Sequence, residues 1–217
     1  MSDLASGRYP DSEEEWALDG FPSPPYRRIG NLKRSDIATG SSGATIGTTN
    51  LMSVFPVTVQ AGDIFQFITL LAAVAGGTLA HSWVALYNGV TAGSALLAQV
   101  ADNTTSTGWA VGANKLTLAS LVSNIGTVGT PQGPSTPPIV AQGPAIWGVA
   151  IYQSGTTLNK FDGMPGGNAG AGLVALTGQA PMVSASASLG AVATAPAVLG
   201  TMTPGNGAVP YGLLSRN

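Results

Sequence analysis

The sequence predicts an all-β protein, an antiparallel and jelly-roll-like β-sandwich that follows an extended N-terminal arm containing one short helix. From residue 51 onward, short apolar runs rich in β-type residues alternate with turn pairs such as Gly76-Gly77 and Asn88-Gly89. No stretch of about 10–15 residues in this region has helical periodicity, so an α/β fold is not expected. Charge is concentrated at the N-terminus, which predicts that the first 40 residues form a separate arm.

The arm differs from the rest of the chain in its charge content. Residues 1–40 contain seven acidic and five basic residues. In a typical soluble domain about a quarter of the residues are charged. A monomer with few charges is poorly protected against association, so we expect identical subunits or a larger assembly to cover part of the body. Residues 41–217 contain only Asp63, Asp102, Lys115, Lys160, Asp162 and Arg216.

One short helix is predicted inside the arm. Asp11 and Ser12 precede Glu14 and Glu15 at the spacing of a capping box, and acidic groups are favourable in a first helical turn. We therefore predict a helix over residues 12–19. A helix of this length is not stable alone in water, so it needs a surface to pack against.

The aromatic and basic residues of the arm indicate a docking segment. A purely solvating tail contains few aromatic residues, and a disordered tail is the alternative that the composition leaves open. In the docking interpretation the aromatic residues anchor the arm on a partner, and the basic residues pair with acidic groups there. The candidate docking residues are Tyr9, Trp16, Phe21, Tyr26, Arg27, Arg28, Lys33 and Arg34.

A linker and a β-sandwich domain are predicted to follow the arm. Residues 41–50 are rich in Gly, Ser and Thr, which is typical of a linker, and the domain is assigned to residues 51–217. Two Pro/Gly-rich loops interrupt the domain, and long loops in compact domains are commonly functional. The loops are residues 122–144 and 163–172, and the predicted strands are residues 51–60, 63–74, 81–88, 95–101, 115–121, 145–153, 157–161, 181–189 and 196–202.

Two predicted strands are apolar on both faces. Residues 83–87 read W-V-A-L-Y and residues 147–152 read W-G-V-A-I-Y, so the two segments are similar in type and order. Such strands belong in the middle of a covered sheet or where a second subunit packs, and we expect them to be core strands and neighbours. Residues 182–189 instead alternate serine with apolar residues, which predicts a half-buried strand.

These strand motifs resemble the β-sandwich domains of virion proteins in tailed phages, most closely the minor tail proteins of phages that infect actinobacteria. The likeness covers about residues 50–215 and leaves the arm unmatched. It implies a multi-copy structural component, often trimeric, at the tail tip, on fibres or on the capsid. The matching segments are S-W-V-A-L-Y (82–87), A-L-L-A-Q-V-A-D (95–102), G-W-A (108–110), W-G-V-A (147–150) and a closing strand P-Y-G-L-L-S (210–215).

We therefore expect a minor tail protein that its arm anchors to other virion proteins. It would be assembled in the bacterial cytoplasm, because the polar and acidic N-terminus does not read as a signal peptide. The alternatives are a capsid decoration protein or head fibre, and a carbohydrate-binding adhesin that contacts a host-surface glycan. Asp102, Asn103 and Trp109 are the candidate glycan contacts, and a core or interface position is the alternative for Trp109.

Few residues are available for catalysis or metal binding. The chain has no cysteine, and its single histidine, His81, beside Trp83, is interpreted as a strand-end residue rather than a triad member or metal ligand. Asp63, Asp102 and Asp162 are interpreted as turn residues, and no glutamate follows residue 40 to complete a glycosidase pair. We expect no enzyme and no cofactor. A hydrolase would need at least two of these four groups within hydrogen-bond range.

Nucleic acid and membrane are not expected as partners. The net charge of −2 provides no basic excess to bind a phosphate backbone. The longest apolar run, residues 64–75, is shorter than the roughly 18 residues that a membrane-spanning helix needs. We interpret it as a buried strand.

Overall fold

The structure is a computed structural model that describes residues 29–30, 44–45, 49–120, 139–141, 143–164, 184–205, 209–210 and 212–215. The regular elements in these residues are all β-strands, and every strand pairing among them is antiparallel. The all-β and antiparallel predictions are therefore confirmed. The helix predicted over residues 12–19 lies outside the described residues.

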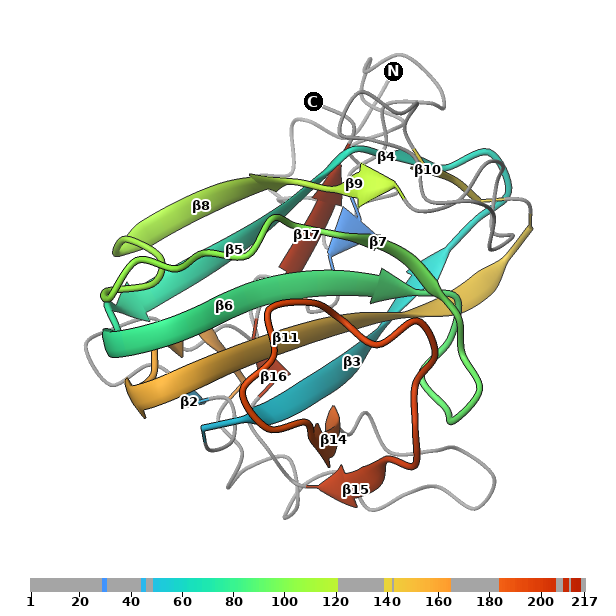
Figure 1. The fold of residues 1–217 in the computed structure, drawn as a ribbon. Coiled ribbons are helices and arrows are strands. Elements are labelled where there is room, and N and C mark those ends of the chain that lie inside the picture. The colour runs from blue at the N-terminus through green and yellow to red at the C-terminus, as the bar shows by residue number, and fades with distance from the viewer. Residues whose placement is uncertain are drawn as a thin grey trace, which may run out of the picture.

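The larger sheet has seven strands in the order β15-β14-β3-β11-β6-β7-β9 (Figure 1). Its two longest strands, β6 and β11, lie side by side in the middle of the sheet. The bounds are β3 Leu51–Val59, β6 Gly77–Tyr87, β7 Leu96–Gln99, β9 Ala119–Ser120, β11 Ala145–Thr157, β14 Ser184–Ser188 and β15 Thr203–Gly205.

The second sheet has six strands, in the order β1-β17-β5-β12-β2 with β8 paired to β5. Its bounds are β1 Ile29–Gly30, β2 Ala44–Thr45, β5 Phe67–Val74, β8 Gly112–Thr117, β12 Lys160–Phe161 and β17 Gly212–Ser215. Two further pairs each join two short strands. They are β4 Ile64–Phe65 with β10 Ile139–Val140, and β13 Gly163–Met164 with β16 Val209–Pro210.

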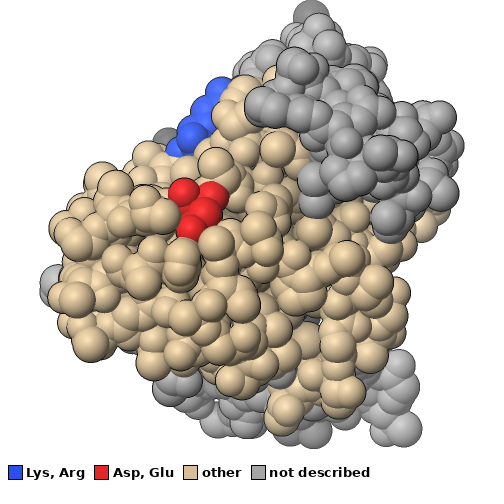
Figure 2. Space-filling model, viewed as in Figure 1, with Lys and Arg blue, Asp and Glu red and all other residues tan. Residues whose placement is uncertain are grey.

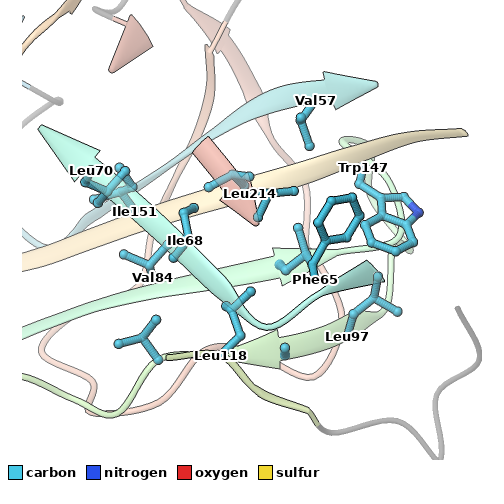
Figure 3. Packing of buried hydrophobic residues seen from close by; sticks show 14 of the residues in the cluster. Val57, Phe65, Ile68, Leu70, Val84, Leu97, Leu118, Trp147, Ile151 and Leu214 are labelled. Atoms are coloured by element: carbon cyan, nitrogen blue, oxygen red, sulfur yellow. The ribbon is translucent and has the colours of Figure 1, made fainter. Parts of the chain in front are cut away.

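Residues from both sheets form one buried apolar cluster, the main core (Figure 3). Phe55 and Val57 enter it from β3, and Ile68 and Leu70 enter it from β5. Neighbouring residues of each strand point to opposite faces, so one face of β3 and one face of β5 supply these side chains. The apolar run at residues 64–75, predicted to be one buried strand, instead forms β4 and β5, and β5 is buried only at alternate residues.

The two strands predicted to be core neighbours are neighbours in the larger sheet. Trp83 of β6 lies opposite Tyr152 of β11, and Tyr87 lies opposite Gly148. All residues from 82 to 87 are buried. Because both faces of these strands are apolar, the larger sheet needs cover on the side away from the main core as well.

The chain itself covers that second face. Residues 189–202, which we call the strap, connect β14 to β15 and cross in front of β11 and β6 (Figure 1). Ala195 and Leu199 of the strap belong to a second buried cluster with Met52, Trp83 and Tyr152. The larger sheet is therefore apolar and covered on both sides within one chain.

The sequence predicts a strand over residues 196–202, and this prediction is wrong. The strap follows an irregular path, and its β pairing is limited to an isolated bridge between Val198 and Ala95. Pro196 has no N–H to donate, which disfavours a continuous ladder through this segment. The apolar residues that suggested a strand instead pack against the face of the sheet.

Parts of the predicted arm and linker pair with the body. Ile29 and Gly30, within the predicted arm, form β1 beside Leu214 and Leu213 of β17. Residues 44–45, within the predicted linker, form β2 beside β12. The sheets therefore begin before residue 51, and they end with β17 at residues 212–215.

We predict that Gly148→Ala destabilises the protein. A Cβ atom at Gly148 would collide with the carbonyl oxygen of Gly89 and would lie 2.9 Å from Val54 Cγ1. Overpacking of this kind lowers the free energy of unfolding by about 1–3 kcal/mol. Each kcal/mol lowers the Tm by about 2–4 °C in a domain of this size. Thermal unfolding measures the change.

Gly200→Ala is the matched control, because nothing lies within 4 Å of a Cβ atom placed at Gly200 in the strap. Its Tm should stay close to that of the unchanged protein. Equal melting temperatures for the two variants would contradict the close approach of β11 to residue 89.

Candidate functional site

Three aromatic side chains of the larger sheet hold the strap through their polar ends. Trp83 Nε1 donates to the carbonyl oxygen of Val192 at 3.0 Å, and Tyr87 OH donates to that of Pro196 at 2.9 Å. The Trp83 and Tyr152 rings stack with centroids 4.8 Å apart. Burial raises the pKa of the Tyr87 phenol, which keeps it a neutral donor suited to a carbonyl acceptor.

Tyr152 makes the most contacts of this kind. Its hydroxyl donates to the carbonyl oxygen of Gly190 and accepts a bond from Val192 N at 3.1 Å. A side-chain amide adds to the anchoring, because Ala195 N donates to Gln99 Oε1 at 3.0 Å. These bonds satisfy the backbone of an irregular segment that has little β-ladder of its own.

The side of the molecule that carries the strap is almost uncharged. Figure 2 shows this side, where the described surface carries acidic atoms in one place and basic atoms in another. Among the exposed large apolar side chains are Ile146, Val198 of the strap, and Val111. The exposed strap residues are Gly190, Ala191, Ala193, Thr194, Ala197, Val198, Gly200 and Thr201, and none of them carries a charge.

His81 and Asp102 form a hydrogen-bonded pair at one edge of β6. His81 Nδ1 lies 2.6 Å from Asp102 Oδ2, and the two side chains are 28% and 15% exposed. Asp102 Oδ1 accepts a bond from Ser82 N at 3.0 Å, and Asn103 N donates to Ser82 O at 2.8 Å. Asp102 thereby fastens the loop that follows β7 to the side of β6. The prediction that His81 ends a strand is wrong, because β6 begins at Gly77 and His81 lies inside it.

His81 and Asp102 lie within hydrogen-bond distance, as a hydrolase would need, but no serine or threonine hydroxyl among the described residues is hydrogen-bonded to either of them. Ser154 of β11 lies opposite His81 in the strand register. Within the described residues the two side chains do not hydrogen-bond, and no group of three or more acidic or histidine residues gathers around a potential metal position. Asp63 lies in the turn at residues 60–63, where Gln60 N donates to its Oδ2 at 2.6 Å, in agreement with the turn prediction.

The three candidate glycan contacts all take part in internal contacts. The side chain of Asn103 bonds within its own loop, from Nδ2 to Gly108 O at 2.8 Å and from Thr105 N to Oδ1 at 3.0 Å. Trp109 is 4% exposed and packs in the main core, with its ring centroid 5.8 Å from that of Phe161. The ring is therefore a core residue, the alternative that was left open, and does not present a platform to a sugar.

Sequence reasoning missed Asn159, a fully buried residue that organises this end of the core. Its Nδ2 donates to the carbonyl oxygens of Val74 at 3.2 Å and Trp109 at 2.9 Å. Its Oδ1 accepts bonds from Trp109 N at 3.2 Å and Gln153 Nε2 at 2.8 Å. The one available signal was an asparagine inside a predicted strand, where this residue type is disfavoured.

The eight candidate docking residues of the arm lie outside the described residues. The described residues nearest to them in sequence are those of β1, which pairs with β17. No helix in the described ranges has the length and apolar character needed to cross a membrane.

Comparison with known proteins does not identify a family. No family model matches the chain, and no curated protein matches it.

We predict that Tyr152→Phe destabilises the strap more than Tyr87→Phe does. The first substitution leaves both Gly190 O and Val192 N without their partner, whereas the second affects only Pro196 O. Each of these partly buried groups that is left unpaired lowers the free energy of unfolding by up to about 1–3 kcal/mol. Thermal unfolding of the two variants measures the order, and a larger loss for Tyr87→Phe would contradict these roles.

We also predict that Asp102→Ala loosens the loop after β7. The substitution removes the acceptor of Ser82 N and the partner of His81. We therefore expect the free energy of unfolding to fall by about 1–3 kcal/mol and the Ser82 amide to exchange its hydrogen faster. Thr104→Ala, an exposed position in the same loop, is the matched control. If the Ser82 amide exchanges equally fast in both variants, Asp102 does not hold this edge.

Proposed function

We propose that this chain is a structural subunit of a tailed-phage virion, most simply a minor tail protein. Its body is a jelly-roll-like β-sandwich, and its N-terminal arm docks on a neighbouring virion protein. The observation that carries the proposal is the contrast in charge along the chain, with twelve charged residues in residues 1–40 and six in residues 41–217. A free monomer with so few charges on its body is poorly protected against association, whereas a subunit whose surface is covered in an assembly needs few charges there.

The packing of the two sheets supports the sandwich. Residues of the larger sheet and of the β5 sheet share the main core, and all pairings between described strands are antiparallel. Antiparallel sheets that share a core across their inner faces are the general construction of β-sandwiches. The W-V-A-L-Y motif of β6, one of the segments that resemble virion proteins, contributes Val84 and Leu86 to this core, whereas its Trp83 and Tyr87 belong to the second cluster.

The uncharged surface supports assembly with further copies. The exposed side of the strap carries no charged residue, so covering it would desolvate no ionic group. In this proposal identical subunits, most simply three, cover such surfaces in the particle. Ile146 and Val198 are exposed apolar residues that would be buried by a contact on this side.

The His81–Asp102 pair has a structural role in this proposal. Asp102 uses both carboxylate oxygens to join His81 and the backbone of Ser82, which explains its presence without a reaction. The proposal therefore assigns no enzymatic activity and no cofactor to the chain. A glycan-binding role for the body gains no support from Trp109, because that side chain is in the core.

The part of the arm that precedes β1 is proposed to be the docking segment. It contains all four aromatic anchors and Arg27 and Arg28, whereas Lys33 and Arg34 follow β1. Because Ile29 and Gly30 pair with β17, a truncation that tests docking should end at residue 28 and leave the sheet complete.

We predict that deletion of residues 1–28 removes the protein from phage particles while the body still folds. Loss of several anchoring aromatic residues should lower incorporation by about tenfold or more. Quantitative mass spectrometry of purified particles measures incorporation, and circular dichroism confirms the β-fold. Deletion of residues 1–8, which keeps every aromatic residue of the arm, is the matched control. Incorporation of the longer deletion at full copy number would contradict the docking role.

A capsid decoration protein or head fibre is the second candidate, because the uncharged body fits any position on a particle. The copy number separates the two locations. A decoration protein follows the icosahedral multiplicity of the capsid, whereas a tail-tip component is present in few copies. The same mass-spectrometric quantification on the unmodified particle supplies this number.

A further inference from the structure

One polar cluster lies at the end of the otherwise apolar main core. Ser82 of β6, Gln153 of β11 and Asn159 are 0%, 3% and 0% exposed. Ser82 and Gln153 are directly opposite each other in the strand register, so their side chains lie on the same face of the larger sheet. Polar groups this deeply buried are normally hydrogen-bonded.

The hydrogen bonds of Asn159 fix which way the two amides point. The Nδ2 group of Asn159 has two carbonyl oxygens to donate to, those of Val74 and Trp109, and a carbonyl group cannot donate in return. Asn159 Oδ1 is therefore the acceptor, and it receives Trp109 N and the Nε2 group of Gln153. It follows that Gln153 Oε1 points away from Asn159.

Two buried atoms are left over by this arrangement. Gln153 Oε1 and Ser82 Oγ have no hydrogen-bond partner in the described structure. The first can only accept a hydrogen bond, whereas a hydroxyl can both donate and accept. The two atoms come from opposed positions on adjacent strands but do not hydrogen-bond to each other.

We propose that this position is a binding site for one internal water molecule, which bridges Ser82 Oγ and Gln153 Oε1. The water donates one hydrogen to Gln153 Oε1 and uses its second hydrogen or a lone pair with the Ser82 hydroxyl. Buried waters in proteins characteristically join polar groups that lack other partners. Two oxygen atoms are too few to coordinate a metal cation, so water is the ligand that fits the chemistry of the site.

The bridge would complete a polar network that connects both sheets. Through Gln153 and Asn159 the water is linked to Trp109, at the end of the loop that begins at Asp102, and to Val74 of β5. The loop that Asp102 fastens on one side of β6 is thus also tied into the core at its other end. These internal hydrogen bonds hold the loop in place, so its position does not depend on a ligand bound at the surface.

A crystal structure of the full chain at high resolution tests the site directly. The proposal expects a density peak within about 2.6–3.2 Å of both Ser82 Oγ and Gln153 Oε1. An empty site, a direct bond between the two side chains, or a peak surrounded by five or more oxygen atoms, which would indicate a cation, overturns it. Ser82→Val should remove the peak because its methyl groups occupy the site, whereas Ser53→Ala, a buried serine of β3, should leave it in place.

The sign of a stability change provides a second measurement that does not depend on crystals. If the water is present, Ser82→Ala removes a hydrogen bond and lowers the Tm by about 2–4 °C. If the site is dry, the same substitution removes an unpaired buried hydroxyl and raises the Tm. A higher Tm for Ser82→Ala would therefore overturn the proposal.

Discussion

The contact between the strap and the aromatic face of the larger sheet is the constraint on which the rest of the structure depends. The two central strands, β6 and β11, are apolar on both faces, and the β5 sheet covers only one of them. The strap covers the other face. The rings of Trp83, Tyr87 and Tyr152 fill this second core, and their polar ends hydrogen-bond to the strap backbone. An aromatic side chain with a polar end is suited to this double role.

Because the strap covers the second face of the larger sheet, other subunits are not needed to cover that face. The charge content led to the expectation that companion subunits hide the apolar sheet faces, yet the larger sheet is covered on both sides by its own chain. What remains outside is a surface of small uncharged residues on the strap, together with exposed Ile146 and Val198. In our proposal such a surface meets other subunits without burying charge, and the charged arm supplies the specific contact with the particle.

Patterns within single strands predicted much of the fold, whereas contacts that depend on distant segments were not predictable. The motif at residues 83–87 identified a core strand and its neighbour, because a strand buried on both faces must be central. Alternation could not show that residues 196–202 lie across a sheet instead of within one, since both arrangements bury apolar residues. The burial of Trp109 and the role of Asn159 likewise depend on β5, β11 and β12 meeting at one end of the core.

Amide hydrogen exchange on the unmodified protein tests the closure of the second face most directly. Val192 N, Ala195 N and Leu199 N are bonded to Tyr152 OH, Gln99 Oε1 and Ser94 O respectively. We predict that these three amides exchange nearly as slowly as those of β6 and β11, although the strap is irregular. Exchange at the rate of an unprotected chain would show that the strap does not cover the second face of the larger sheet.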